Sequence, residues 1–355
     1  MRVSIDNKTK EFKTVWMEGN LVKMIDQSKL PQRFEIYTSS DSKQTVDAIK
    51  NMIVRGAPVI GVTVAFGMAQ ACLEAPEYLF DDYIKNAAEI FRKTRPTAYN
   101  LFWSIHMILN SIKKGKSVDE KRKLAVKEAN KIANEDVKKC KIIGEYGKKL
   151  IKDGYRILTH CNAGALATVD YGTALAPIRF AHYEGKKIFI FVDETRPRCQ
   201  GSKLTSWELL QEGIPHAIIA DNAAGYYMQK GEIDICVVGA DRVTADGSIA
   251  NKIGTYEKAI LAKENKIPFY VAFPTSTIDM NIKSGKDIPI EERSEEEVTH
   301  VTGFTEGDIK KVRIAPEGSH AKNPAFDVTP AKYITKFITE KGIINPKDIK
   351  KLFKR

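Results

Sequence analysis

Two residue types suited to acid–base work stand at comparable places in the second half of the chain. Cys161 follows the apolar run 156–160, and Asp241 follows the apolar run that ends at Gly239. A thiol between a strand end and a helix lies where the helix dipole lowers its pKa. A carboxyl group among apolar neighbours can hold its proton near neutral pH and act as a general acid. The pattern predicts a thiol and acid pair, although a buried small residue and a helix N-cap fit the same positions.

Two arginines in the first half of the chain precede predicted helix starts. Arg55 is followed by Gly56, Ala57 and a proline, and Arg95 is followed by a proline and a threonine. Proline suits the first turn of a helix, where the backbone N–H groups are free and the dipole is positive. A guanidinium beside such a helix start binds phosphate oxygens in a bidentate manner. These two segments are therefore predicted to hold a phosphate group.

Polar residues in two further loops extend this candidate site. Gln200 precedes a glycine in the loop after the second predicted strand, and Asn251-Lys252 follow the loop after the fourth. Amide and ammonium groups at these places are predicted to complete the polar lining.

Short apolar runs alternate with helical stretches after Gly154, as expected for a parallel sheet covered by helices on both faces. In such sheets, ligands bind beyond the carboxyl ends of the strands. The predicted strands are 156–160, 187–192, 216–220, 234–239 and 268–273.

The first part of the chain has a different character. Residues 14–40 alternate between strand-like and turn-like segments, and helical spacing of apolar residues begins after Asp41. We therefore expect an α/β protein with two domains: residues 1–125, mainly helical with a small β appendage, and residues 126–355, a Rossmann-like parallel sheet domain. Further helices are expected at 58–74, 81–94, 97–114 and 120–152.

Several cofactor signatures are absent from the sequence. No Gly-x-Gly-x-x-Gly follows the first predicted strand, and there is no Walker-type loop, no His-Glu-x-x-His and no Cys-x-x-Cys. The five cysteines are widely spaced, which argues against a disulfide framework. We accordingly expect no cofactor and no metal ion.

The formal net charge of +11 suits nucleic acid, anionic surfaces or phosphorylated small molecules equally well. The lysines alternate with acidic residues along 121–152, which is typical of a solvated helix face. The N-terminal segment has no apolar signal-peptide core, and no run approaches the roughly 18 apolar residues of a membrane span. We expect a soluble cytoplasmic protein with no nucleic-acid or membrane partner.

Several segments together resemble the methylthioribose-1-phosphate isomerase family, and the likeness runs from about Thr14 to Pro346. That family is related to ribose-1,5-bisphosphate isomerase and to the regulatory subunits of translation initiation factor two B, so a shared fold alone does not settle the function. The segments that carry the resemblance are 54–58, 95–103, 158–168, 193–198, 238–242, 250–255 and 323–330.

The resemblance implies an aldose–ketose isomerase that converts 5-methylthioribose 1-phosphate to the corresponding ribulose 1-phosphate in methionine salvage. It makes Cys161 and Asp241 the catalytic pair and implies a homodimer that acts on a small sugar phosphate. The positions that match the family's substrate-binding residues are Arg55, Gly56, Ala57, Arg95, Gln200, Asn251 and Lys252.

Three alternatives remain open at this point. Another sugar 1-phosphate, 5-deoxyribose 1-phosphate or ribose 1,5-bisphosphate, differs only in the substituent on C5, and Ala163 stands where the methylthioribose branch often has threonine. A regulatory subunit without enzymatic activity has the same fold. Within the isomerase hypothesis, Cys161 either removes the proton on C2 through an enolate or stabilises a hydride shift.

Overall fold

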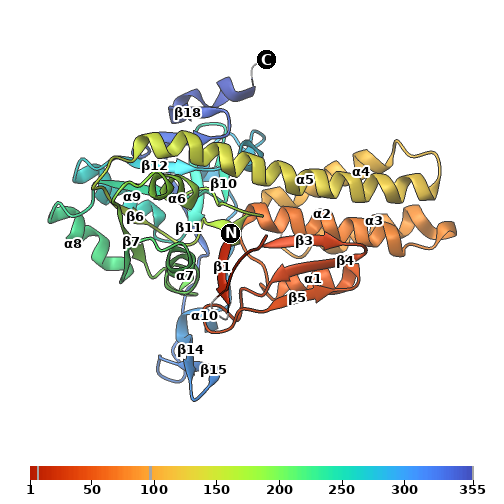
Figure 1. Cartoon of the computed structure of the whole chain (residues 1–355), viewed down its shortest axis with the longest axis horizontal. Coiled ribbons are helices and arrows are strands. Elements are labelled where there is room, and N and C mark those ends of the chain that lie inside the picture. Colours follow the sequence, from red (N-terminus) through yellow and green to blue (C-terminus); the bar gives the residue numbers. More distant parts are fainter. Residues whose placement is uncertain (6–7, 96–97, 354–355) are drawn as a thin grey trace. The chain divides into compact units, whose positions relative to one another are not determined.

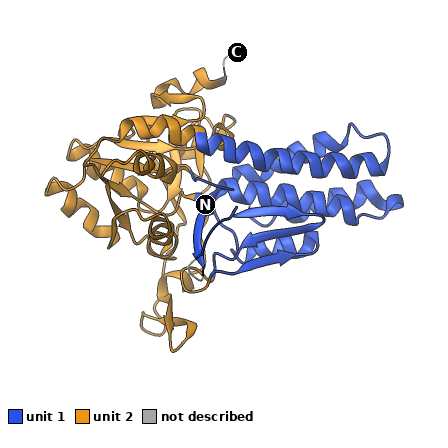
Figure 2. Ribbon diagram, in the orientation of Figure 1, with its two compact units in different colours: residues 1–28, 34–141, 165–172 blue, residues 29–33, 142–164, 173–355 orange. Residues whose placement is uncertain are grey.

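The chain folds into two compact units, each built from non-contiguous segments. The computed structural model describes residues 1–5, 8–95 and 98–353 (Figure 1). Unit 1 comprises residues 1–28, 34–141 and 165–172, and unit 2 comprises residues 29–33, 142–164 and 173–355 (Figure 2). The predicted boundary at 125/126 lies within helix α5 (Val118–Gly147), which carries residues of both units. The predicted division into two domains stays a prediction.

Unit 1 is mainly helical, as predicted. Its central helix, α2, is buried on nearly all sides within unit 1 and packs closely against α4. The helices are α1 (Ser42–Lys50), α2 (Ala57–Glu74), α3 (Phe80–Arg92), α4 (Tyr99–Ile112) and the first part of α5 (Val118–Gly147).

Helix α2 corrects one expectation from the sequence. Over its 18 residues it is long and apolar enough to cross a membrane by length and composition alone. Its residues are 83% buried inside the protein, however, as in the core helix of a globular unit. Thr63 and Gln70 interrupt the apolar run in the sequence. The buried Gln70 amide donates hydrogen bonds to the backbone carbonyls of Asn20 and Ser39.

The predicted β appendage is present as a three-stranded antiparallel sheet of β3 (Val15–Glu18), β4 (Leu21–Ile25) and β5 (Ile36–Ser39). A further hairpin, β1 (Arg2–Ile5) with β2 (Lys8–Glu11), precedes it and was not predicted. Val15, Val22 and Met24 join the same apolar core as α2, so the appendage is part of unit 1.

Unit 2 contains a seven-stranded sheet with the order β18-β17-β12-β9-β6-β7-β8. All neighbouring pairs are parallel except β17 with β18. Its strands are β6 (Arg156–Thr159), β7 (Phe189–Asp193), β8 (His216–Ile219), β9 (Ile235–Val238), β12 (Phe269–Ala272), β17 (Lys336–Thr339) and β18 (Gly342–Ile344).

The six parallel strands reproduce the 3-2-1-4-5-6 order of a doubly wound sheet, with β6 in the first position and β9 in the fourth. The chain proceeds outward from β6 through β7 and β8, then returns to the other side of β6 at β9. The prediction of an α/β fold with a Rossmann-like sheet is confirmed, and all five predicted strands are found within two residues of their predicted ends.

Unit 2 also has elements that were not predicted. A four-stranded sheet has the order β13-β10-β11-β16, and a separate hairpin pairs β14 with β15. These strands are β10 (Arg242–Thr244), β11 (Ile249–Lys252), β13 (Ile278–Asp279), β14 (His300–Thr305), β15 (Asp308–Arg313) and β16 (Phe326–Thr329).

The helices of unit 2 are short, apart from α5, whose last residues pack against α6. A side chain at Gly144 would meet Phe180 and Ala176, so glycine permits this close approach. The helices are α6 (Leu175–Tyr183), a π-helical turn η4 (Gly201–Thr205), α7 (Ser206–Gln211), α8 (Ala224–Gln229), α9 (Thr255–Glu264) and α10 (Glu296–Thr299). Short 3₁₀ turns throughout the chain are η1 (Glu77–Leu79), η2 (Lys148–Leu150), η3 (Ala165–Ala167), η5 (Asp221–Ala223), η6 (Thr275–Thr277), η7 (Gly285–Asp287), η8 (Ala331–Tyr333) and η9 (Pro346–Phe353).

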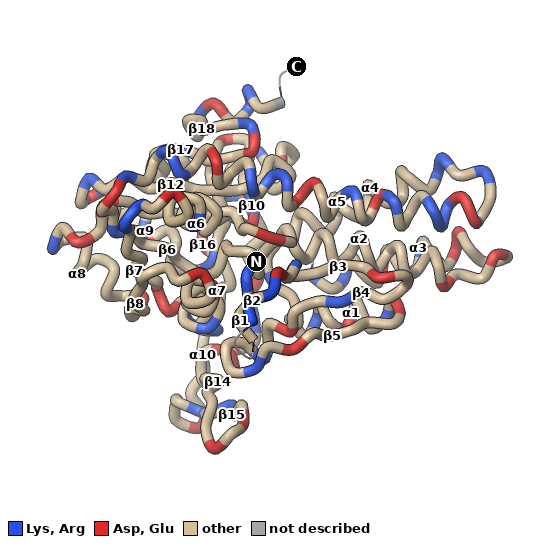
Figure 3. The backbone as a smooth tube through the Cα atoms, in the orientation of Figure 1, with Lys and Arg blue, Asp and Glu red and all other residues tan. Residues whose placement is uncertain are grey.

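Charged residues alternate in sign along α5 (Figure 3). A salt bridge three residues apart joins Lys131 to Glu128 on this helix, and Glu145 near its end pairs with Lys148 of the following turn η2. Exposed pairs of this kind contribute little to stability. The positive net charge is therefore partly spread over solvated helix faces, as the sequence suggested.

Candidate active site

Cys161 and Asp241 follow adjacent parallel strands of the large sheet. Strand β6 pairs with β9 through Ile157 with Ile235 and Leu158 with Cys236. Both residues therefore lie at the carboxyl edge, on either side of the point where the strand order reverses. Loops diverge at such a switch point and leave a crevice for a ligand.

The backbone of Cys161 is held in the left-handed region, with φ at 64°. This conformation costs free energy for a residue other than glycine and persists only where its surroundings enforce it. The Cys161 N–H donates to the Thr195 hydroxyl at 2.8 Å, and the Thr205 hydroxyl donates to the Cys161 carbonyl at 2.7 Å. Two threonines from the loops after β7 thus fix the residue that carries the thiol.

Thr195 is itself fixed by its neighbours in the fold. Its φ is 64°, its hydroxyl donates to the Asp193 carbonyl, and its N–H donates to Asp221 at 2.7 Å. Asp221 accepts a second bond from the Arg196 N–H at 2.6 Å. The connections after β6, β7 and β8 are therefore joined by hydrogen bonds at the carboxyl edge.

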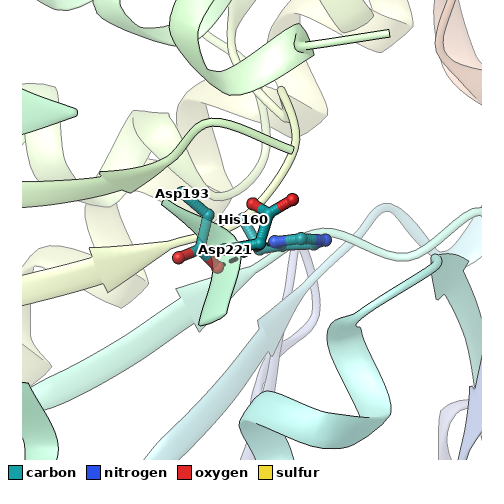
Figure 4. Close-up of side chains that lie close together, drawn as sticks. All are labelled: His160, Asp193 and Asp221. Atoms are coloured by element: carbon teal, nitrogen blue, oxygen red, sulfur yellow. Dashed lines mark hydrogen bonds and ion pairs between the residues drawn. The ribbon is translucent and has the colours of Figure 1, made fainter. Parts of the chain in front are cut away.

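His160 lies at the end of β6, directly before Cys161, and is almost fully buried. Its Nδ1 lies 2.8 Å from a carboxylate oxygen of Asp193, and its Nε2 lies 2.8 Å from the carbonyl oxygen of Ile253 (Figure 4). The Lys258 ammonium lies 3.9 Å from the same oxygen of Asp193. Burial raises the pKa of Asp193, while His160 and Lys258 act in the opposite direction.

His160, Asp193 and Asp221 also lie close enough together to suggest a metal site, with one ligand atom from each within 4.8 Å of the others. The hydrogen bonds already described engage both imidazole nitrogens and both oxygens of Asp221. The ammonium of Lys258 beside Asp193 also disfavours a second cation. Hydrogen bonding accounts for this cluster, and the prediction that no metal is bound stays a prediction.

Asp241 stands between β9 and β10, and its backbone N–H donates to the Ala250 carbonyl at 2.9 Å. Ala250 directly precedes Asn251 on β11. This backbone hydrogen bond therefore ties the segment that carries Asp241 to the strand that carries Asn251 and Lys252.

Asn251 and Lys252 are both buried on β11. The Asn251 amide donates to the Thr255 hydroxyl at 2.9 Å, and the Lys252 ammonium donates to the Ala325 carbonyl at 2.9 Å. The same ammonium group also lies 4.8 Å from the centroid of the Phe326 ring.

Asp327 on β16 pairs with Asn251 and accepts hydrogen bonds from the N–H groups of Gly254 and Tyr256 at the start of α9. Burial raises its pKa to about 6, although these bonds oppose the shift.

Gln200 precedes η4 and is 7% exposed. Within the described part of the chain, its buried side-chain oxygen accepts no hydrogen bond. An unsatisfied buried acceptor costs roughly 1–3 kcal/mol and calls for an explanation. A hydroxyl group of a bound substrate would supply the missing hydrogen bond. The backbone also packs closely at the next residue, because a side chain on Gly201 would collide with the Asp193 carbonyl.

In unit 1, Arg55, Gly56 and Ala57 lie at the start of α2. Gly56 has φ at 110° and precedes the first helical residue, and no side chain caps this helix start among the described residues. A Cβ at Gly56 would lie 2.8 Å from the Cα and Cβ of Ala167. This position therefore requires glycine both for its conformation and for space. The helix start has the backbone geometry expected of an anion-binding turn.

Arg95 follows α3 and is partly buried. The residues after it in the predicted second phosphate-binding segment, Pro96 and Thr97, lie outside the described residues. Helix α4 begins at Tyr99, after Ala98 as its N-cap.

Two groups of predicted residues emerge. The carboxyl edge of the sheet in unit 2 carries Cys161, Asp241, Gln200, Asn251 and Lys252, whereas Arg55, Gly56, Ala57 and Arg95 belong to unit 1. The sequence reasoning missed His160, Asp193, Thr195 and Thr205. Of these, His160 ends one predicted strand and Asp193 directly follows another, which was the available signal.

The comparisons with known proteins agree on one family. Residues 53–346 match the model of the initiation factor 2 subunit family. The chain belongs to this family. A protein from Geotalea uraniireducens named methylthioribose-1-phosphate isomerase is 52% identical over 342 residues, which cover 94% of this chain and 95% of that protein. A protein of the same name from Acetivibrio thermocellus is 51% identical, covering 92% and 95%.

Two solved structures extend the likeness to the fold. The 5-methylthioribose 1-phosphate isomerase of Pyrococcus horikoshii is 46% identical with a TM-score of 0.86, covering 97% of this chain and 96% of that one. A structure from A. fulgidus described as translation initiation factor eIF-2B, subunit delta, is 43% identical with a TM-score of 0.81, covering 95% and 97%. The resemblance stated from the sequence is confirmed.

Proposed function

We propose that this family member is an aldose–ketose isomerase that converts 5-methylthioribose 1-phosphate to 5-methylthioribulose 1-phosphate, a step of methionine salvage. The observation that carries the proposal is the placement of Cys161 and Asp241 on adjacent strands across the switch point. The relatives named for this activity match nearly the whole chain.

The substrate's chemistry explains why an acid is needed. The phosphate on C1 locks the sugar as a cyclic acetal, so the ring must open before any carbonyl group is available. In the proposed first step Asp241 donates a proton to the ring oxygen as the bond from C1 to that oxygen breaks.

The second step moves hydrogen from C2 to C1. Cys161 either takes the C2 proton and returns a proton to C1 through an enolate, or stabilises a direct hydride shift. In both routes the C2 hydroxyl gives its proton to the Asp241 carboxylate left by the first step and C2 becomes a ketone, so C2 is oxidised and C1 reduced within one molecule. The reaction therefore needs no external electron carrier.

The remaining predicted residues hold the substrate. Arg55, Arg95 and the α2 start are proposed to bind the phosphate, and Gln200, Asn251 and Lys252 are proposed to bind sugar hydroxyls or phosphate oxygens.

A panel of three sugar phosphates tests the proposal: 5-methylthioribose 1-phosphate, 5-deoxyribose 1-phosphate and ribose 1,5-bisphosphate. The expected result is formation of a ketose from the first, measured by ¹³C NMR of the new carbonyl, with a higher kcat/KM than for the bisphosphate. A preference for the bisphosphate would move the activity to another branch of the family.

A regulatory subunit without catalysis is the second candidate, favoured by the 43% identity to the structure described as an initiation factor subunit. It predicts binding of a sugar phosphate or nucleotide with no turnover of any of the three substrates. A homodimer is also proposed, and sedimentation equilibrium with a mass twice that of the chain would support it.

A further inference from the structure

We propose that His160 is a positioning residue of the isomerase: by sharing one proton with Asp193 and bonding Ile253, it holds Cys161 in its left-handed conformation. This inference rests on the proposed function for its kinetic consequence, but its structural part can be tested without any substrate.

The hydrogen bonds of His160 determine where its protons are. The carbonyl oxygen of Ile253 can only accept, so the Nε2 atom 2.8 Å away must carry a hydrogen. A single proton then lies between Nδ1 and the Asp193 carboxyl group, 2.8 Å apart. Whether it sits on nitrogen or oxygen, the two residues together carry no net charge.

A pair without net charge fits the burial of the two side chains, which are 1% and 0% exposed. A buried group with an uncompensated charge is strongly destabilising, whereas a hydrogen-bonded pair of zero net charge is tolerated.

Charged groups approach this pair from several elements. Lys258 from α9 lies 3.9 Å from the oxygen of Asp193 that faces His160, and it also pairs with Glu257 at 3.2 Å. The charge of Asp221 from η5 raises the pKa of Asp193. Asp327 from β16 interacts electrostatically with both His160 and Lys258. The neighbouring groups therefore carry charges of both signs. These charges offset one another, so the pair does not have to gain or lose its shared proton.

The imidazole joins three segments that carry site residues. His160 directly follows β6 and precedes Cys161. Its Nδ1 bonds Asp193 at the end of β7, and its Nε2 bonds Ile253, the residue after Asn251 and Lys252. A shift of one segment relative to another would change the direction of the Cys161 thiol. A misplacement of about 1 Å can cost on the order of 10²-fold in rate.

The placement of the proton is tested first, in the full-length protein labelled with ¹⁵N-histidine, without substrate. The six histidines of the chain give a tractable spectrum, and H160N identifies the signal of His160. The expected result is a hydrogen on Nε2 of His160, as its bond to the Ile253 carbonyl requires. A bare Nε2 would overturn the proposal.

Two variants of Asp193 then test the hydrogen bond at Nδ1. Asp193→Asn can donate its amide hydrogen to a neutral imidazole, so it keeps the contact; Asp193→Ala removes the contact, although a neutral imidazole still leaves the site without net charge. We expect D193N to retain kcat within about tenfold of the unaltered enzyme and D193A to lose about 10²-fold, with KM changed less than threefold in both. Equal losses in both variants, or a loss confined to KM, would contradict a positioning role.

The conformation of Cys161 provides a readout that does not depend on activity. Selective ¹³C-cysteine labelling reports its backbone geometry, and D193A should shift the Cys161 signals while D193N leaves them in place. The matched control is His216→Asn, because His216 also bonds a backbone carbonyl, that of Ile214, but stands on the outer strand β8. It should change neither kcat nor the Cys161 signals. If no substrate turns over, the proposed function is wrong. The NMR measurements still decide where the proton of His160 lies and whether Asp193 affects the conformation of Cys161.

Discussion

Cys161 and Asp241 emerge from neighbouring strands whose connections run in opposite directions across the sheet. The thiol and the carboxyl group therefore belong to different β–α connections and need not move together. This arrangement suits a reaction in which one group acts on the ring oxygen and the other acts at C2.

Removing either group should stop the chemistry while leaving binding in place. We expect Cys161→Ser and Asp241→Asn each to lower kcat by about 10² to 10⁴-fold, as for the loss of an acid or base, with a much smaller change in KM. Steady-state kinetics on 5-methylthioribose 1-phosphate measures this. Cys199→Ser is the matched control, because that thiol also lies in a left-handed loop residue, with φ at 59°, after β7. Turnover close to normal in either active-site variant removes that residue from the mechanism.

The two arginines of unit 1 should act on binding. Arg55→Ala and Arg95→Ala are expected to raise KM at least tenfold, because each loses a charge-assisted contact to the phosphate. Arg92→Ala serves as the control, since its exposed side chain pairs only with Glu89 among the interactions described for it. A KM unchanged in both arginine variants would show that the phosphate is bound elsewhere.

Gln200→Leu should separate binding from stability. Its side-chain oxygen is buried and accepts no hydrogen bond within the described chain, so leucine should leave the free energy of unfolding unchanged or increase it, while KM rises. Gln70→Leu is the opposite case, because the Gln70 amide donates two buried hydrogen bonds and its oxygen accepts one from Thr45. That variant should lose about 1–3 kcal/mol of stability with unchanged kinetics. Urea unfolding and substrate kinetics give both quantities, and destabilisation by Gln200→Leu would mean that Gln200 is structural.

Gly56→Ala should destabilise unit 1 by more than Gly19→Ala. Both glycines have positive φ, at 110° and 60°, but only at Gly56 would the new Cβ meet Ala167 at 2.8 Å; at Gly19 it would meet no described atom within 4 Å. Thermal unfolding should show a loss of about 1 kcal/mol at Gly19 and a larger loss at Gly56. Equal losses would argue that Ala167 moves aside freely.

Asp136 on α5 gives a prediction about pH. Burial raises its pKa to about 6 from an ordinary value of 3.8, although the Val169 N–H donates to it at 2.8 Å. The folded protein therefore binds this proton more tightly than the unfolded chain, so the stability contributed by this group is complete below about pH 4 and is lost as the pH rises to about 6. Asp136→Asn keeps an acceptor for Val169 without the charge. Relative to the unaltered protein, it should gain stability between pH 4 and pH 6, as measured by urea unfolding at each pH; a difference that does not vary with pH would contradict the shift.

The sequence predicted the parallel sheet well because its strands are almost wholly apolar, as in Ile235–Val238. It did not predict β10 and β11, because Arg242, Thr244, Asn251 and Lys252 are polar residues that are buried there. Polar residues in a buried strand erase the alternation by which a strand is recognised.

The same limit applies to the candidate site. Cys161 and Asp241 could be identified because each follows a readable strand. The role proposed for His160 could not, because its partners Asp193 and Ile253 lie 33 and 93 residues away in the chain. Only the strand order brings them together.

The segment 165–172 belongs to unit 1, although the residues on both sides of it belong to unit 2. Within unit 1, Thr14 bonds Ala165 and Val169, and the Gln27 amide bonds Leu166. A gene fragment encoding residues 142–355 would carry this segment without the partners that enclose its apolar side chains. Expressed alone, that fragment should be prone to aggregation, so a single cut in the coding sequence does not separate the two units.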